Sequence, residues 1–268
     1  VHSGVDLVAS FIAYYSVKNS SQPPDKHHRF GHGKIESLSG FVEGILILFA
    51  ALWIIYESIK KLIEPQIIQK IELAIIIMFI SSIINFIVAR KLFRTAKKTD
   101  SIALKADGFH LMTDVYTSLG VVFSLFMIWF IGVVFNGKHF YFLDPLCAIV
   151  ISFLIIKGGI ALLKEATGEL IDTSLALSDL EKIKKIILSN KMIISFKNLK
   201  TRKSGKVRFI EFDAMFEENI SLKDAHSITD DISKKIKRDL IDADIIIHME
   251  PCDKKCLNEE CRQNCKVL

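Results

Sequence analysis

The chain is organised around the apolar stretch ADGFHLMTDVYTSLGVVFSLFMIWFIGVVF, residues 106–135. This stretch is long enough to cross a bilayer, because a spanning helix needs about 20 residues. Within it, His110 and Asp114 lie four positions apart, which places an imidazole and a carboxylate on one face of a helix, one turn apart. An ionisable side chain at membrane depth is normally turned inward and partnered. The stretch therefore predicts a membrane-spanning helix with a functional site.

A second pair with the same spacing, His2 and Asp6, lies in the apolar segment that opens the chain. Two imidazoles and two carboxylates form a four-ligand set that suits a divalent transition metal in tetrahedral geometry, zinc first and Fe(II) next. Two unrelated hydrogen bonds on helix faces are the alternative, but they would have to arise twice. We predict that His2, Asp6, His110 and Asp114 bind one metal ion.

Half of the 268 residues are hydrophobic, which is high for a soluble protein of this size. The apolar segments predict five membrane spans, at about residues 1–17, 35–63, 71–88, 106–135 and 144–163. The first is short, so we expect the chain to lack its natural N-terminus. Lys and Arg concentrate in residues 18–34 and 90–105, which places these loops and the C-terminal portion in the cytoplasm. The net charge of +5 therefore fits membrane topology and does not indicate nucleic acid.

After residue 172 the sequence takes on a soluble pattern. Apolar periodicity and turn signals predict the order αββαβ, a small α+β domain of ferredoxin-like kind. We predict three parts: a transmembrane domain in residues 1–172, a cytoplasmic domain in residues 173–252, and a Cys-rich tail in residues 253–268. The thiols of the tail could bind a soft metal, or the tail could be disordered with reduced thiols.

Three further groups of polar residues are candidate sites. The loop before the second span contains Asp25, His28 and His32, a spacing that could gather three ligands around one ion, although a solvated basic loop is an equal alternative. In the soluble domain the candidates are Asp213, His226, His248 and Glu250, each of which taken alone could be surface polarity. Glu43 and Asp107 lie in apolar segments. A hydrogen-bonded or protonated helix residue is the simpler interpretation of Glu43, and Asp107 fits either a helix-start charge or an entrance residue.

These motifs together carry a family resemblance. The two His/Asp pairs, the stretch FGHGKIES at residues 30–37, Asp144-Pro145 and the stretch IIHMEPC at residues 246–252 resemble the cation diffusion facilitator family of metal/proton antiporters, especially its bacterial zinc and iron efflux members. The resemblance implies a homodimer with six spans per protomer and a cytoplasmic metal-binding domain, so the family's first span would be missing from the five seen here. A histidine at the position of His2 resembles the zinc-selective members, whereas aspartate there accompanies broader use of iron, cadmium and zinc.

Carried onto matching positions, the resemblance implies a transport site at His2, Asp6, His110 and Asp114 and a loop site at Asp25, His28 and His32. The C-terminal site matches less well. Lys197 and Asp213 stand where histidines are usual, and Glu250 replaces an aspartate, while His226 and His248 agree with the family pattern.

Metal binding needs neutral imidazole and ionised carboxylate, so it competes with protons at the same atoms. A site that opens alternately to the two sides would then exchange metal for protons. We predict a secondary active efflux transporter in the cell (inner) membrane, with Zn²⁺ as the main substrate and as a candidate regulator, and Fe²⁺ or Cd²⁺ as other substrates. Its partners would be protons, the lipid bilayer and a second copy of the chain.

Two other functions are alternatives to transport. One is a membrane metal sensor or scaffold that binds ions without moving them. The other is an intramembrane metallohydrolase, but the sequence contains no His-Glu-x-x-His motif, and four protein ligands would leave no open position for an activated water. We therefore expect the protein not to be an enzyme.

Overall fold

The computed structural model describes the backbone of residues 2–64, 71–134, 142–240, 242–252 and 265, and the side chains of these residues except 2–9, 71–77, 129 and 132–134. The chain divides into two compact units, Val1–Thr167 and Gly168–Leu268. Apart from residue 265, the predicted Cys-rich tail at residues 253–268 lies outside the described residues.

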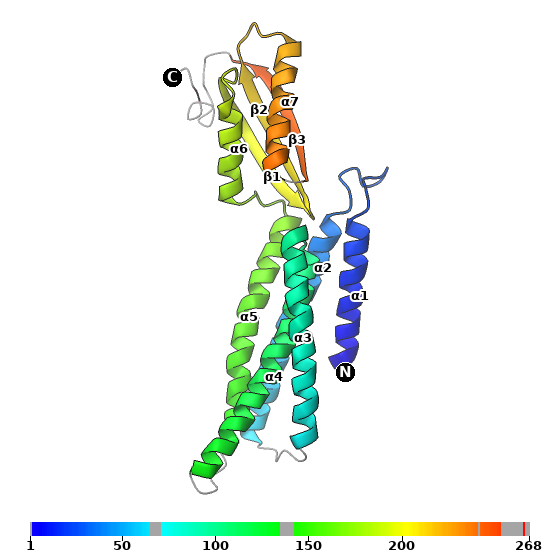
Figure 1. Cartoon of the computed structure of the whole chain (residues 1–268), viewed down its shortest axis with the longest axis vertical. Coiled ribbons are helices and arrows are strands. Elements are labelled where there is room, and N and C mark those ends of the chain that lie inside the picture. Colours follow the sequence, from blue (N-terminus) through cyan, green and yellow to red (C-terminus); the bar gives the residue numbers. More distant parts are fainter. Residues whose placement is uncertain (1, 65–70, 135–141, 241, 253–264, 266–268) are drawn as a thin grey trace. The chain divides into compact units, whose positions relative to one another are not determined.

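The first unit is helical throughout its regular structure (Figure 1). Helices satisfy their own backbone hydrogen bonds, which the interior of a bilayer requires. Pro23 and Pro24, which cannot continue a helix, lie in the connection between the first two. In the described residues the helices are α1 (His2–Ser20), α2 (Lys34–Ile63), α3 (Ile71–Thr99), α4 (Ile102–Val134) and α5 (Leu143–Leu170). Of these, α2, α4 and α5 are long and apolar enough to cross a membrane in the part of the chain that is described.

The core of this unit lies where α2, α4 and α5 meet. Its buried members are small or aliphatic: Ile47, Ala51, Ile102, Ala106, Ile155, Leu162 and Ala166. Helix α3 packs along α4, and α1 lies against α2 and α4. Large apolar side chains such as Phe49 and Phe153 remain exposed on the outer faces of the helices, which suits contact with lipid.

Gly158 of α5 accommodates the residue next to His110. A Cβ atom added at Gly158 would lie 2.0 Å from Cζ of Phe109. The aromatic ring on α4 therefore fills a space that only glycine leaves open on α5. This contact fixes how α4 lies against α5 at the level of His110.

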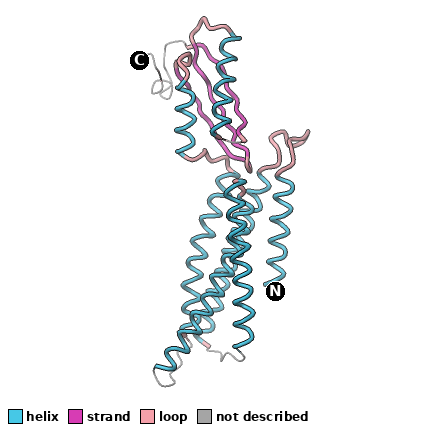
Figure 2. Tube along the Cα trace, in the orientation of Figure 1, coloured by secondary structure: helices cyan, strands magenta, loops and turns pink. Residues whose placement is uncertain are grey.

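The second unit is a three-stranded sheet covered by two helices (Figures 1 and 2). Its elements are α6 (Leu177–Ser189), β1 (Ser195–Ser204), β2 (Val207–Phe216), α7 (Leu222–Asp239) and β3 (Ala243–Pro251). Strands β1 and β2 are antiparallel, joined through Gly205 at φ 58°, and a two-residue hairpin loop favours such a glycine. Strand β3 pairs parallel to β2 after the α7 crossover.

The helices of this unit cover one face of the sheet. Ile183 and Ile187 of α6 and Ile232 of α7 join Phe196 and Phe212 of the sheet in a buried cluster. Because side chains alternate along a strand, the residues between these core positions point to the other face. The predicted fold class, a helical membrane domain followed by a small αββαβ domain, is confirmed.

Candidate metal sites

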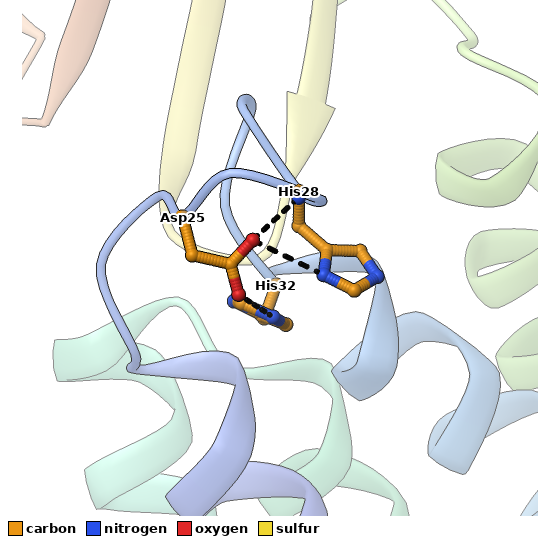
Figure 3. Close-up of side chains that lie close together, drawn as sticks. All are labelled: Asp25, His28 and His32. Carbon is orange, nitrogen blue, oxygen red and sulfur yellow. Dashed lines mark hydrogen bonds and ion pairs between the residues drawn. The ribbon is translucent and has the colours of Figure 1, made fainter.

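The loop between α1 and α2 brings three candidate ligands together. His28 Nδ1 lies 3.5 Å from Oδ1 of Asp25, and His32 Nε2 lies 3.5 Å from Oδ2 of the same residue. One ligand atom from each of the three residues can be chosen so that all lie within 4.8 Å of one another. Figure 3 shows both imidazoles beside the Asp25 carboxylate. The D-x-x-H-x-x-x-H spacing therefore places its polar atoms close enough to surround one ion.

Backbone hydrogen bonds fold this loop. The N–H groups of His27 and His28 donate to Oδ1 of Asp25 at 2.7 and 2.6 Å. The N–H of Gly31 donates to the carbonyl of His28 at 2.9 Å, and Gly31 has φ 80°, a conformation that glycine adopts without strain. The turn at Gly31 brings His32 back toward Asp25.

The same hydrogen bonds set the charge of the carboxylate. The backbone N–H of His28 lowers the pKa of Asp25 below its ordinary value of 3.8, burial opposes this, and the His27 N–H and the two nearby imidazoles reinforce it. Asp25 is therefore ionised near neutral pH, which is the form that binds a metal ion. The three side chains differ in exposure, since 59% of His28 and 49% of Asp25 but only 11% of His32 is exposed. An ion can reach the cluster from solution while His32 anchors it to the protein.

A second cluster forms on the uncovered face of the sheet. Strand pairing sets Asp213 of β2 opposite His248 of β3, and Glu250 follows two residues later on the same face. His248 Nδ1 lies 3.6 Å from Oδ1 of Asp213 and 3.6 Å from Oε1 of Glu250. The ligand atoms of the three residues lie within 4.8 Å of one another.

Two residues of β1 already contact this second cluster. The Lys197 ammonium lies 2.5 Å from Oε2 of Glu250, and the Asn198 amide donates to Oδ2 of Asp213 at 2.6 Å. Asn198 has φ 53° and lies at the register shift between Lys197 and Lys200. Lys197 thus compensates part of the negative charge that would attract a cation to the cluster.

The structure does not bring His226 to this cluster. Its Nε2 atom lies 3.8 Å from Oδ2 of Asp230 on the same helix, α7. Helix α7 packs through Ile232 and Ile236 on the opposite face of the sheet. Of the four candidates in this unit, Asp213, His248 and Glu250 gather within one chain and His226 stands apart.

Two of the four predicted transport ligands lie on α4. His110 is 8% exposed, and Asp114 follows one turn later on the same helix. The other two, His2 and Asp6, lie on α1, where the side chains fall outside the described part of the chain. Because α1 lies against α4, a shared site between these helices stays a prediction.

Two buried carboxylates in the same unit were not predicted as ligands. Glu43 of α2 is 1% exposed; its Oε1 accepts a hydrogen bond from the Ser39 hydroxyl at 3.5 Å, and its Oε2 has no hydrogen-bond partner among the described residues. Oδ1 of Asp107 on α4 is likewise buried without such a partner in the described part of the chain. Charged residues within apolar segments were the available signal, but the sequence does not reveal which of their atoms lack partners.

A cavity of about 220 Å³ opens among α2, α4 and α5, between the last turns of α2 and the first turns of α5. Thr117, one turn after Asp114, lines it together with Glu57 and Asp144. Oδ1 of Asp144 accepts a hydrogen bond from the Ser124 hydroxyl at 2.7 Å.

Comparisons with known proteins agree along the length of the chain. Residues 1–171 match the family model of the cation efflux transmembrane domain, and residues 175–252 match that of the cation efflux protein, cytoplasmic domain. Protein p34 of Rickettsia rickettsii is 32% identical over 251 residues, covering 94% of this chain and 80% of that protein. The cation-efflux pump FieF of Salmonella agona is 32% identical over 252 residues, covering 94% and 81%.

Among solved structures, the metal-bound C-terminal domain of the CzcD transporter from Thermotoga maritima is similar to the second unit. It is 26% identical, covers 31% of this chain and 94% of its own, and gives a TM-score of 0.28. The family matches and the relatives together span both units. The chain therefore belongs to the cation diffusion facilitator family, as a divalent metal cation efflux transporter with a helical membrane domain and a cytoplasmic domain.

Proposed function

We propose that this protein exports Zn²⁺ from the cytoplasm across the inner membrane in exchange for protons, with Fe²⁺ and Cd²⁺ as weaker substrates. The observation that supports this most directly is the placement of His110 and Asp114. An imidazole that is 8% exposed and a carboxylate one turn away lie on α4, a helix long and apolar enough to span the bilayer. Imidazole nitrogen and carboxylate oxygen atoms are ligands of divalent transition metals, and ionisable residues within membrane helices usually mark ion pathways.

The proposed transport site combines His2 and Asp6 of α1 with His110 and Asp114 of α4. Neutral imidazoles donate lone pairs to the metal, and the two carboxylates compensate its charge. When protons reach the site, they take the same lone pairs and release the ion. Alternate opening toward the cytoplasm and the outside then couples metal export to proton import.

The two gathered clusters would act on the cytoplasmic side. We propose that Asp25, His28 and His32 capture the ion where α1 and α2 are connected, because two of these three side chains remain open to solvent. Asp213, His248 and Glu250 would bind a regulatory ion in the cytoplasmic domain of a homodimer. His226 would join that site only if the partner protomer supplied it. Within one chain it belongs to α7, the helix that packs on the opposite face of the sheet.

The experiment is zinc uptake into proteoliposomes with an acidic lumen, followed together with the exit of protons. The wild-type chain should take up zinc and release protons, and Asp114→Ala should abolish both. The control Asp239→Ala, at an exposed position on α7, should transport normally. Zinc flux retained by Asp114→Ala would contradict the site. Binding without flux by the wild-type chain would instead identify a sensor, and competition with Fe²⁺ and Cd²⁺ ranks the substrates.

A further inference from the structure

Several buried polar atoms in the membrane unit have no hydrogen-bond partner among the described residues. Among the described residues, the buried side-chain nitrogen and oxygen atoms that lack a hydrogen-bond partner are His32 Nδ1, Glu36 Oε2, Glu43 Oε2 and Asp107 Oδ1. Each such atom costs free energy, because burial removes its water without a replacement. His32 belongs to the loop cluster, Glu36 and Glu43 belong to α2, and Asp107 belongs to α4, three residues before His110.

Three of these residues follow one face of the start of α2. His32 lies two residues before the first residue of the helix. Glu36 follows four residues later and Glu43 seven residues after that, which is about one and then two helical turns. Glu36 is 8% exposed and accepts a hydrogen bond at Oε1 from the Ser20 hydroxyl at 2.9 Å. Each of the two glutamates therefore has one oxygen bonded to a serine and one oxygen without a partner.

The fourth residue, Asp107, belongs to the neighbouring helix at the same level. Helices α2 and α4 approach closely there, since a Cβ atom added at Gly40 would lie 3.3 Å from Cγ1 of Ile102. Glu43 follows Gly40 by one turn, and Asp107 follows Ile102 by little more than one turn. The carboxyl groups of Glu43 and Asp107 lie close enough for their charges to interact, and so do Asp107 and His110. The series thus continues from α2 to His110.

Two buried carboxylates are costly unless they are protonated or meet positive charge. Within the described part of the chain, neither Glu43 nor Asp107 forms an ion pair with a lysine or arginine that accounts for its buried oxygen. Glu165, in contrast, pairs with Lys105 nearer the surface. Carboxylate and hydroxyl oxygens bind divalent cations. A dication near Glu43, Asp107 and Ser39 would satisfy both unpartnered oxygens and neutralise both charges.

We propose that Glu43 and Asp107 form a second cation-binding position in the membrane unit, which receives the metal from the loop cluster and passes it to His110 and Asp114. This inference rests on the proposed transport function. Asp107 and His110 are separated by one turn of α4, about 4.5 Å of rise along the axis, so an ion moves a short distance between the two positions.

Two measurements on the full-length chain test this position. The first is the KM and kcat of zinc uptake in proteoliposomes for Glu43→Gln and Asp107→Asn, which keep side-chain size and remove charge. A residue that only helps to bind the ion on its way raises KM with little change in kcat, and we expect a rise of about tenfold or more. Glu64→Gln, at the exposed C-cap of α2, is the matched control and should leave KM unchanged.

The second measurement is the number of zinc ions bound at equilibrium by the detergent-solubilised chain. The double variant Glu43→Gln/Asp107→Asn should bind one fewer ion than the wild type, whereas Asp114→Ala should retain that ion. An unchanged KM with an unchanged ion count would overturn the proposal. A lower kcat with altered proton release and an unchanged ion count would also overturn it, since it would assign the pair to protons. If the wild-type chain shows no flux, the proposed function fails, and the ion count still decides whether this position exists.

Discussion

Replacing Lys197 with methionine should strengthen metal binding at the cluster of Asp213, His248 and Glu250. Lys197 Nζ lies 2.5 Å from Oε2 of Glu250, while Oε1 of that carboxylate faces His248 at 3.6 Å. A metal ion bound through Oε1 would therefore share Glu250 with an ammonium group. Methionine keeps much of the length of the lysine side chain and removes its charge.

The size of the effect follows from Coulomb's law. Two unit charges 4 Å apart interact by about 1 kcal/mol in water, so a dication and an ammonium at a similar distance repel each other by about 2 kcal/mol. Removing the ammonium should raise the affinity for zinc by roughly 30-fold. The side chains of Lys197 and Glu250 are only 24% and 27% exposed, so water screens this repulsion less completely than bulk water would.

The assay is competition for Zn²⁺ with a chromogenic chelator in a background that carries Asp25→Ala, Glu43→Gln, Asp107→Asn and Asp114→Ala. These changes disable the other candidate sites. The control is Lys200→Met, which removes the same charge from an exposed position on the same strand and should change affinity much less. Equal affinities in the Lys197→Met variant and its parent would refute the assignment of a cation to this cluster.

Three further outcomes are expected. Replacing His28 or His32 with alanine should make zinc affinity at the loop site fall less steeply as the solution is acidified, because protons compete with the metal for imidazole nitrogen; zinc titrations from pH 5 to 8 measure this. Gly158→Ala should reduce zinc flux by about tenfold or more, because Cζ of Phe109 must retreat from 2.0 Å to at least 3.4 Å; uptake assays and size-exclusion profiles separate this from misfolding. Phe212→Ala, in the core of the second unit, should lower its unfolding free energy by about 3–5 kcal/mol, measured by denaturant titration.

Much of the fold could be predicted from local patterns. Apolar length predicted the helices α2, α4 and α5, and the alternation of strands with a turn at Gly205 predicted the hairpin of β1 and β2. The loop cluster was also predictable, because the three ligands lie within eight consecutive residues and Gly31 supplies the turn between them. In each case the determining interactions are close in sequence.

Other features depend on contacts between distant segments. The parallel pairing of β3 with β2 sets His248 opposite Asp213, and the packing of α7 places His226 on the other face of the sheet. The sequence could list these residues but could not sort them by face. The unpartnered oxygens of Glu43 and Asp107 likewise arise from how α2 meets α4, which residue spacing does not encode.

The most direct test of the central claim is the position of zinc in crystals of the full-length protein, located by anomalous scattering at the zinc absorption edge. We expect a peak between α1 and α4, with nitrogen atoms of His2 and His110 and oxygen atoms of Asp6 and Asp114 at about 2.0–2.2 Å from the ion. The absence of a peak at this place, or imidazoles of residues 2 and 110 too far apart to share one ion, would contradict the claim.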